Sequence, residues 1–200
     1  MRTLPCGIIL FLCFLLFWNC GDKANVAQET TFTKQDSLTE RYLGLQDSLL
    51  KAWNMMIHDD NEKLTTMHNL LHELMVSNPL QREELHAFEE RLNQLAASRY
   101  TQKTMENADV IEEYDFASNS LVIELIAFAE SQTEFSYNTT LQKLTDEIRM
   151  ADQRVNNYRA EYDAVVVEYN TFIEKNKGYL KEIDQSNSFE KKPLFQMVSE

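Results

Sequence analysis

Two histidines stand close enough along the chain to share a metal ion. His68 and His72 are four residues apart, so on a helix their imidazoles share one face, and histidine pairs at this spacing can bind zinc. Glu73 lies outside the pair, so the glutamate that metalloproteases place between two such histidines is missing. Because Leu71 and Leu74 set the buried face, we expect both histidines at its rim. A metal site at His68 and His72 is the alternative.

Other candidate chemistry is incomplete. Glu83 and His86 form the Glu-x-x-His unit of di-iron bundles, but those sites need a second copy, and the chain has none. Asp59 and Asp60 are expected to lie in water at a bend, with weak binding of a divalent ion as the alternative. The sequence contains no phosphate-binding glycine loop, Gly-x-Ser-x-Gly elbow or Cys/His dyad. We therefore predict no catalytic residue, no metal ligand and no cofactor, and a protein that is not an enzyme.

Composition narrows the fold and the partners. The 200 residues hold 19 Lys and Arg against 32 Asp and Glu, a net charge of -13, which disfavours nucleic acid as a partner. Only 4 Gly and 3 Pro are present, too few for the frequent turns of a β-sandwich or for the glycine-rich turns of a doubly wound α/β fold. An all-α protein is the remaining class.

The first twenty residues have the features of a targeting signal. Arg2 precedes an apolar run from Gly7 to Trp18, which is short for a membrane span but suits a signal peptide. All three cysteines lie here, and Cys20 ends the run, as in bacterial lipoprotein signals. We predict a signal peptide over 1–20, lipidation (palmitate) on Cys20 and a flexible linker over 21–35. A permanent, uncleaved anchor is the alternative.

The position after Cys20 bears on localisation. Gly21 carries no charge that could retain a lipoprotein at the inner membrane. We therefore expect a bacterial cell-envelope protein that is lipid-anchored to a membrane. The outer membrane is favoured, with the protein on its periplasmic or surface face.

Helical periodicity fills the rest of the chain. Apolar residues at 3–4 spacing predict a first helix over 36–76, with a shift of the stripe at 58–61. Asn78 is expected to cap a second helix with Pro79 in its first turn, and Thr139 to open the last helix through a capping box. That helix carries an apolar seam at positions 141, 144, 148, 151, 155, 158, 162, 165, 169, 172 and 176. The pattern predicts an elongated antiparallel four-helix bundle with long first and last helices over 36–186. A coiled-coil dimer is the alternative.

Several segments resemble the LemA family. The segments 129–130 and 138–141 are similar to its V-E-A-Y-P-x-L-x-A-N-x-x-F stretch, and Ala52-Trp53 with Asn69-Leu70-Leu71 to its A-W…P-N-L-V stretch. The segments 154–155, 162–165 and 167–173 are similar to R-I-x-x-A-R-x-x-Y-N-x-A-V-x-x-Y-N-T-x-I, and 189–195 to the closing F-x-x-K-P-x-F. Departures include Thr133 for Pro and Asp163 for Asn, so the chain resembles a divergent member. The resemblance implies a membrane-tethered helical bundle in the bacterial envelope, and it supplies no catalytic residues.

These segments supply the packing and interaction candidates. Tyr162 and Tyr169 lie on the predicted seam and are expected to fill the core, and Asn170 beside them to hydrogen-bond to a neighbouring helix. Pro193 prevents a helix through the tail at 187–200. We expect the tail to fold back and place the rings of Phe189 and Phe195 on the bundle. A mobile tail that binds a partner is the alternative. Trp53, which lies in a segment that resembles the LemA family, is the last of these packing and interaction candidates.

The sequence thus predicts a membrane-tethered, non-enzymatic helical interaction module whose partner is another envelope protein. A structural spacer or self-associating coiled coil, and hence a homo-oligomer, is the first alternative. A metal-binding bundle that uses His68 and His72 is the second.

Overall fold

The computed structural model describes residues 33–186 and 188–195. Residues 1–33 and 34–200 form two separate units, and every helix described here belongs to the second. The predicted signal peptide with Cys20, most of the linker, and the tail positions 187 and 196–200 lie outside the described residues.

The described chain is all-helical and contains no strand, as predicted, and its first and last helices are the long ones. The four α-helices are α2 (Lys34–Ser77), α3 (Arg82–Ala97), α4 (Ala108–Ser131) and α5 (Thr139–Ile183). Two short 3-10 helices, η1 (Pro79–Gln81) and η2 (Thr104–Glu106), precede α3 and α4.

Helix starts differ from the prediction in two places. The side chain of Asn78 makes no capping hydrogen bond, because its amide donates instead to Glu134 across the end of the bundle at 2.8 Å. Pro79 consequently opens η1, and α3 starts three residues later. At α5 the cap is Asn138 rather than Thr139: its side-chain oxygen accepts from the backbone N–H groups of Thr140 and Leu141, which satisfies two amides that have no partner within the helix.

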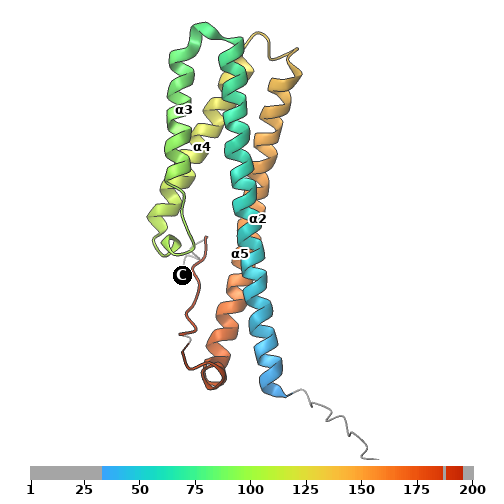
Figure 1. Ribbon diagram of the computed structural model, residues 1–200, viewed down its shortest axis with the longest axis vertical. Helices are drawn as coiled ribbons and strands as arrows, with labels where there is room; N and C mark the ends of the chain where they lie inside the picture. Colours follow the sequence, from blue (N-terminus) through green and yellow to red (C-terminus); the bar gives the residue numbers. More distant parts are fainter. Residues whose placement is uncertain (1–32, 187, 196–200) are drawn as a thin grey trace, which may run out of the picture. The chain divides into compact units, whose positions relative to one another are not determined.

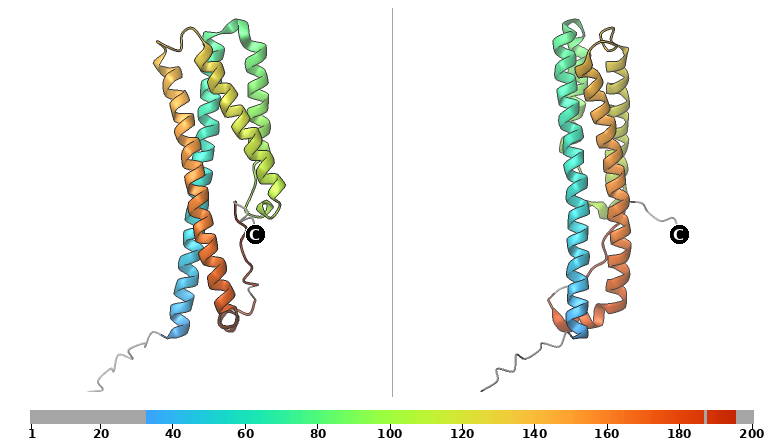
Figure 2. Two further views of the ribbon diagram at one scale, coloured as in Figure 1. Left: turned by 180° about the vertical axis from the view of Figure 1, so that it is seen from behind. Right: turned by 90° about the vertical axis from the view of Figure 1, so that its right-hand side faces the viewer.

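The long helices α2 and α5 lie side by side in every view (Figures 1 and 2). The α3–α4 pair packs against the second half of α2 and the first half of α5 (Figure 1). We call residues 58–77 and 139–157 of these helices, together with α3 and α4, the hairpin half. Beyond it, residues 34–57 and 158–183 form the strap half. There the extended C-terminal segment 188–195, the strap, runs back along the two helices toward the loop between α3 and α4 (Figures 1 and 2).

The buried stripe of α2 has no phase shift, so the predicted change at 58–61 is wrong. Buried positions continue at 3–4 spacing from Met56 through Asp59 and Lys63 to Met67. The stripe merely changes from apolar to charged residues and back, and the charged residues find partners inside the bundle, as described below.

The seam of α5 is wider than predicted. Positions 141, 148, 151, 155, 162 and 169 are buried, whereas 144, 158, 165, 172 and 176 are half-buried. Thr145, Val166 and Ile173, each one position further on, are buried instead. A helix that contacts several neighbours buries about three of every seven residues rather than two, so the seam broadens into a face.

Candidate functional site: a buried charge network beside the strap

Charged side chains lie inside the bundle halfway along α2. Asp59, Asp60 and Lys63 expose only 5 %, 2 % and 2 % of their surface. The expectation that Asp59 and Asp60 lie in water at a bend is therefore wrong. Because a buried charge without a partner is strongly destabilising, the surrounding helices must supply partners.

Lys63 is held from three sides. Its Nζ lies 3.1 Å from Asp152 Oδ1 on α5 and 3.3 Å from Asp60 Oδ1 one turn back on α2. It also donates to the buried hydroxyl of Ser118 on α4 at 3.0 Å. One ammonium group thus connects three helices.

Asp60 binds a tyrosine and an arginine through its other oxygen. The Tyr114 hydroxyl donates to Asp60 Oδ2 at 2.7 Å, and Arg99 Nε lies 2.9 Å from the same oxygen. Burial, followed by the charge of Asp60, raises the pKa of Tyr114 far above its usual value. The phenol consequently stays protonated at neutral pH and acts as a hydrogen-bond donor.

Asp59 points to α5. Its Oδ1 accepts from Arg154 Nε at 3.0 Å, and Arg154 also reaches the exposed carboxylate of Glu62 at 3.1 Å. Arg154 thus connects the buried Asp59 to the exposed Glu62 at the surface between α2 and α5.

A second centre lies closer to the strap. Arg159 donates to both oxygens of Asp115, at 2.7 and 2.6 Å, and to the Tyr100 hydroxyl at 2.8 Å. Burial lowers the pKa of Arg159, but the hydrogen bond and charge of Asp115, together with Tyr100, outweigh it and raise that pKa overall. Burial raises the pKa of Tyr100 to about 12. Its hydroxyl in turn lies 3.8 Å from Met56 Sδ.

These groups form the charge network, and its charges balance. Each of its four aspartates contacts a cation. The members are Asp59, Asp60, Lys63, Arg99, Tyr100, Tyr114, Asp115, Ser118, Asp152, Arg154 and Arg159. Carboxylates paired in this way are poor general bases, so the arrangement favours cross-linking of helices over acid–base chemistry.

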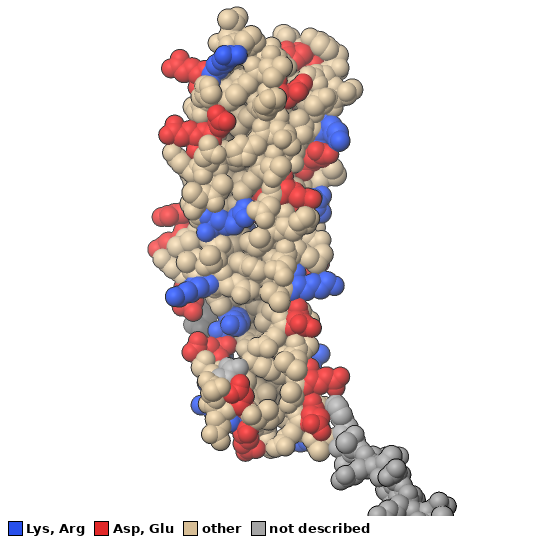
Figure 3. Space-filling model, in the orientation of Figure 1, with Lys and Arg blue, Asp and Glu red and all other residues tan. Residues whose placement is uncertain are grey.

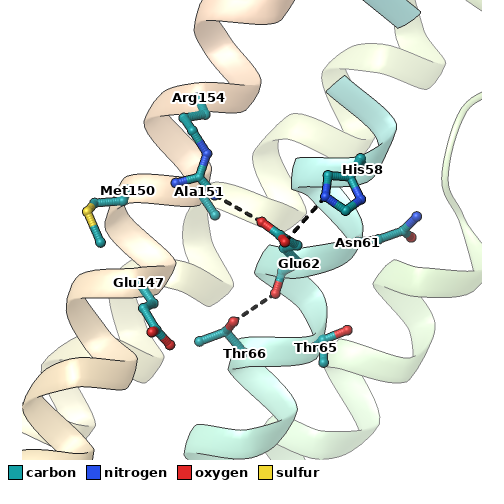
Figure 4. Close-up of a pocket in the computed structure, with 9 residues that line it drawn as sticks. All are labelled: His58, Asn61, Glu62, Thr65, Thr66, Glu147, Met150, Ala151 and Arg154. Atoms are coloured by element: carbon teal, nitrogen blue, oxygen red, sulfur yellow. Dashed lines mark hydrogen bonds and ion pairs between the residues drawn. The ribbon is translucent and has the colours of Figure 1, made fainter. Parts of the chain in front are cut away.

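An open groove lies where the network reaches the surface (Figure 4). His58 and Arg154 converge there on Glu62, with His58 Nε2 3.3 Å from Glu62 Oε1. The groove has a volume of about 580 Å³ and is also lined by Thr66 and Met150. Acidic and basic side chains are interspersed over the face seen in Figure 3, so this face has no continuous basic surface.

The strap places two aromatic rings on the bundle. Phe189 is buried, 5.4 Å from the ring of Tyr42. It adopts a φ of 48°, a left-handed conformation that costs a residue with a side chain about 1–3 kcal/mol. Phe195 enters a cage in which the rings of Tyr100 and Tyr162 each lie 5.5 Å away. Trp53 stacks on Phe195 at 6.3 Å.

Side chains of α5 hold the backbone of the strap. The Asn170 amide donates to the carbonyl of Lys192 at 2.9 Å and accepts from its N–H at 2.8 Å. Asp163 Oδ1 accepts from the N–H of Phe195 at 2.8 Å. The expectation that Asn170 bonds to a neighbouring helix is therefore wrong, because its partner is an extended segment. The half-buried Pro193 lies between the two attachment points.

The remaining candidates lie elsewhere. His68 is half-buried and His72 exposed on α2, and His86 contacts Glu89 at 3.1 Å. Within the described residues, no three His, Cys, Asp or Glu side chains are grouped to hold a metal ion. The role of Cys20 falls outside the described part of the chain.

Sequence reasoning missed Lys63, Arg99, Arg159 and most of their partners. One signal was available: Asp59 and Lys63 continue the 3–4 spacing of the apolar stripe, and a charged residue at a stripe position indicates a buried partner. The partners, however, come from α4, from α5 and from the loop between α3 and α4, all far away in sequence.

No helix in the described part of the chain is long and apolar enough to span a bilayer. Comparisons with models of protein families, with curated proteins and with solved structures find no match for this chain.

Proposed function

We propose that this protein is a membrane-tethered, non-enzymatic envelope protein whose helical bundle is an interaction module. The observation that carries the proposal is the pairing within the charge network. Its four aspartates all contact cations, so the polar interior joins helices rather than offering a reactive group. The surfaces that remain for function are outer faces and grooves.

The LemA resemblance of the last third supports the same proposal. In the proposed antiparallel, elongated bundle, α2 and α5 run in opposite directions. Three contacts support this: Arg41 pairs with Glu168, Asp59 with Arg154, and Glu73 with Asn138. The residue number rises along α2 while it falls along α5.

The tether itself is a lipid on Cys20, with the outer membrane favoured. Replacing Cys20 by Ala removes the acylated thiol, so we expect the protein to leave the membrane fraction or to accumulate as an unprocessed precursor. Cys13→Ala is the matched control and should fractionate like the wild type. Membrane attachment that survives Cys20→Ala, together with a wild-type chain of precursor length, would indicate a permanent anchor.

Photo-crosslinking in the native envelope tests the module. A photoreactive phenylalanine analogue at Phe116, which is 79 % exposed on α4, should capture an envelope protein. The same analogue at buried Leu121 of α4 should not. Capture should depend on Cys20, because the tether places the bundle beside its partner. Scanning the exposed apolar positions of the whole bundle, Leu80, Phe116, Ile123 and Val167 among them, without any specific adduct would contradict the proposal.

Self-association is the second candidate. Leu43 and Leu50 on α2 are both 55 % exposed and seven residues apart, the spacing at which two helices pair. Light scattering that gives a dimer, and a monomer after Leu43→Glu with Leu50→Glu, would favour the spacer. The His68/His72 metal site remains a prediction that metal analysis of the purified protein decides.

A further inference from the structure

The strap lies in a groove whose contacts suit a peptide rather than a helix. The strap follows α2 and α5 in the strap half, on the side where the α3–α4 pair ends (Figures 1 and 2), and the groove that it occupies is defined by its contacts with Tyr42 and Trp53 of α2 and with Tyr162 and Asn170 of α5. Asn170 makes a two-point hydrogen bond to the main chain of one residue, and Asp163 binds the main chain three residues further on. Any extended segment other than one with proline at these positions offers the same groups.

Selectivity comes from two side-chain positions. The first is the cage of Trp53, Tyr100 and Tyr162, which holds the ring of Phe195, while the Arg159 guanidinium lies 5.0 Å from the ring centre. The second is Glu174, 3.1 Å from Lys191 of the strap. The cage is the main side-chain contact, and the exposed Glu174–Lys191 pair adds a weaker one; together they favour a basic residue followed, four positions later, by an aromatic one.

The strap does not fill the groove. A cavity of about 140 Å³ remains between Lys192 of the strap and the rings of Tyr162 and Tyr169. A second, of about 470 Å³, lies beside Leu194 and Phe195 against Met105 and Ile111. A segment with larger side chains at these positions would bury more surface than the strap does.

Charge favours a basic occupant. The groove presents the carboxylates of Asp163 and Glu174 to the strap, whose own Lys191 and Lys192 are basic. The whole chain has a net charge of -13. A partner segment with lysines or arginines would therefore be attracted to the groove.

We propose that the groove binds an extended, basic segment with an aromatic side chain from another protein, and that the strap occupies it in cis as a competitor. The proposal rests on the proposed interaction function and specifies its site. Because the strap is covalently attached, its local concentration is in the millimolar range. A partner segment must therefore bind the groove more tightly than the strap does in order to displace it.

The test measures peptide binding to the purified full chain in detergent. The probe is a fluorescently labelled peptide with the sequence SFEKKPLF, followed by anisotropy. Phe189→Ala with Phe195→Ala removes both rings of the strap, and this double variant should bind the peptide at least tenfold more tightly than the wild type. A peptide with both phenylalanines changed to alanine should not bind.

Asn170→Ala, added to the double variant, should weaken binding at least tenfold. Asn176→Ala is the matched control, because Asn176 lies on the same helix and its amide binds the carbonyl of Phe172 rather than the strap. Circular dichroism verifies that each variant remains helical.

Three results would overturn the proposal. They are equal affinity of the wild type and the double variant, no detectable binding, and binding that Asn170→Ala leaves unchanged. A concentration-dependent dimer of the wild type that Asn170→Ala abolishes would instead assign the groove to the strap of a second copy. The assay does not involve the envelope, so its failure is distinct from a failure of membrane tethering or of capture at Phe116.

Discussion

The α3–α4 pair and the strap cover the same two long helices with different kinds of side chain. In the hairpin half the fully buried residues are mostly aliphatic, among them Leu70, Leu74, Leu92, Leu125 and Ile148. In the strap half the interior is rich in rings, including Tyr42, Trp53, Tyr162, Tyr169, Phe189 and Phe195.

The difference follows from what each cover can supply. A helix satisfies its own backbone and offers a full face of side chains, so branched aliphatic residues interdigitate with it. The strap is a single extended segment, so it brings fewer side chains to the long helices than the α3–α4 pair does. Large rings on α2 and α5 fill the space that it leaves, while Asn170 and Asp163 accept hydrogen bonds from two of its backbone N–H groups. The hairpin half should therefore open only with global unfolding, and the strap half locally.

The largest effect is expected at the boundary of the two halves. Lys63→Ala leaves Asp60 and Asp152 without their shared cation, and breaking a buried ion pair costs about 3–5 kcal/mol. Chemical denaturation should show this loss as a lower free energy of unfolding. Lys143→Ala, which removes a lysine from an exposed pair with Glu147, is the control. A loss below about 1 kcal/mol for Lys63→Ala would mean that the network is not structural.

One pair of substitutions compares the halves directly. Leu125→Ala should lower global stability by about 2–5 kcal/mol, because it leaves a cavity in the aliphatic core. Phe195→Ala should cost less globally and should change the fluorescence of Trp53, which it contacts. Trp53 is the only tryptophan after Trp18. If Phe195→Ala changed the rates of amide hydrogen exchange equally in both halves, local opening of the strap half would be contradicted.

Alkaline pH should affect the strap half first. Burial, helped by the charge of Asp163, raises the pKa of Tyr162 to about 12 from an ordinary value of about 10. The unfolded chain releases this proton first, so the stabilisation is complete below pH 10 and is lost as the pH rises toward 12. Phenolate absorbance and Trp53 fluorescence should change together in this range, and Tyr162→Phe should reduce the loss. Opening of the hairpin half at lower pH than the strap half would refute the comparison.

The smallest effect is expected at a surface pair of the hairpin half. Hydrogen bonds from Arg91 and Ser120 lower the pKa of Glu124 to about 2. The contribution of this pair is present above pH 4.5 and is lost as the pH falls toward 2. Because the pair is exposed, Glu124→Gln should change stability at neutral pH by less than about 1 kcal/mol. A larger loss of stability for Glu124→Gln, measured by thermal melting, would show that surface charge, and not the interior, distinguishes the halves.

The sequence predicted the helices because their signal is local. The predicted range 36–76 differs from α2 by two residues at its start and one at its end, and six of the eleven predicted positions of the α5 seam, Leu141 and Tyr162 among them, are buried. Helical periodicity depends only on neighbours three and four residues apart. The helix starts at Asn78 and Asn138 were harder, since competing hydrogen-bond partners decide which side chain caps.

Spacing places Asp59 and Lys63 on the buried stripe, but it could not show which partners they or Asn170 bind. Lys63 contacts Asp152, which lies 89 residues later in the chain, and Asn170 of α5 contacts Lys192, which belongs to the extended strap. Charged residues in a helix are usually solvated, so local patterning assigns Asp59 and Asp60 to the surface. Only the packing of all four helices determines which carboxylate finds which cation.

The position of Lys63 on the apolar stripe also makes the bundle intolerant of sliding. If α5 moved along α2 by one heptad, Asp152 would lose its ammonium partner. The leucines and methionines that flank Lys63 on the stripe would then lie against an unpaired charge. Aliphatic seams alone accept such displacements at little cost. A single lysine therefore fixes the axial register of the two long helices, that is, how far each extends past the other.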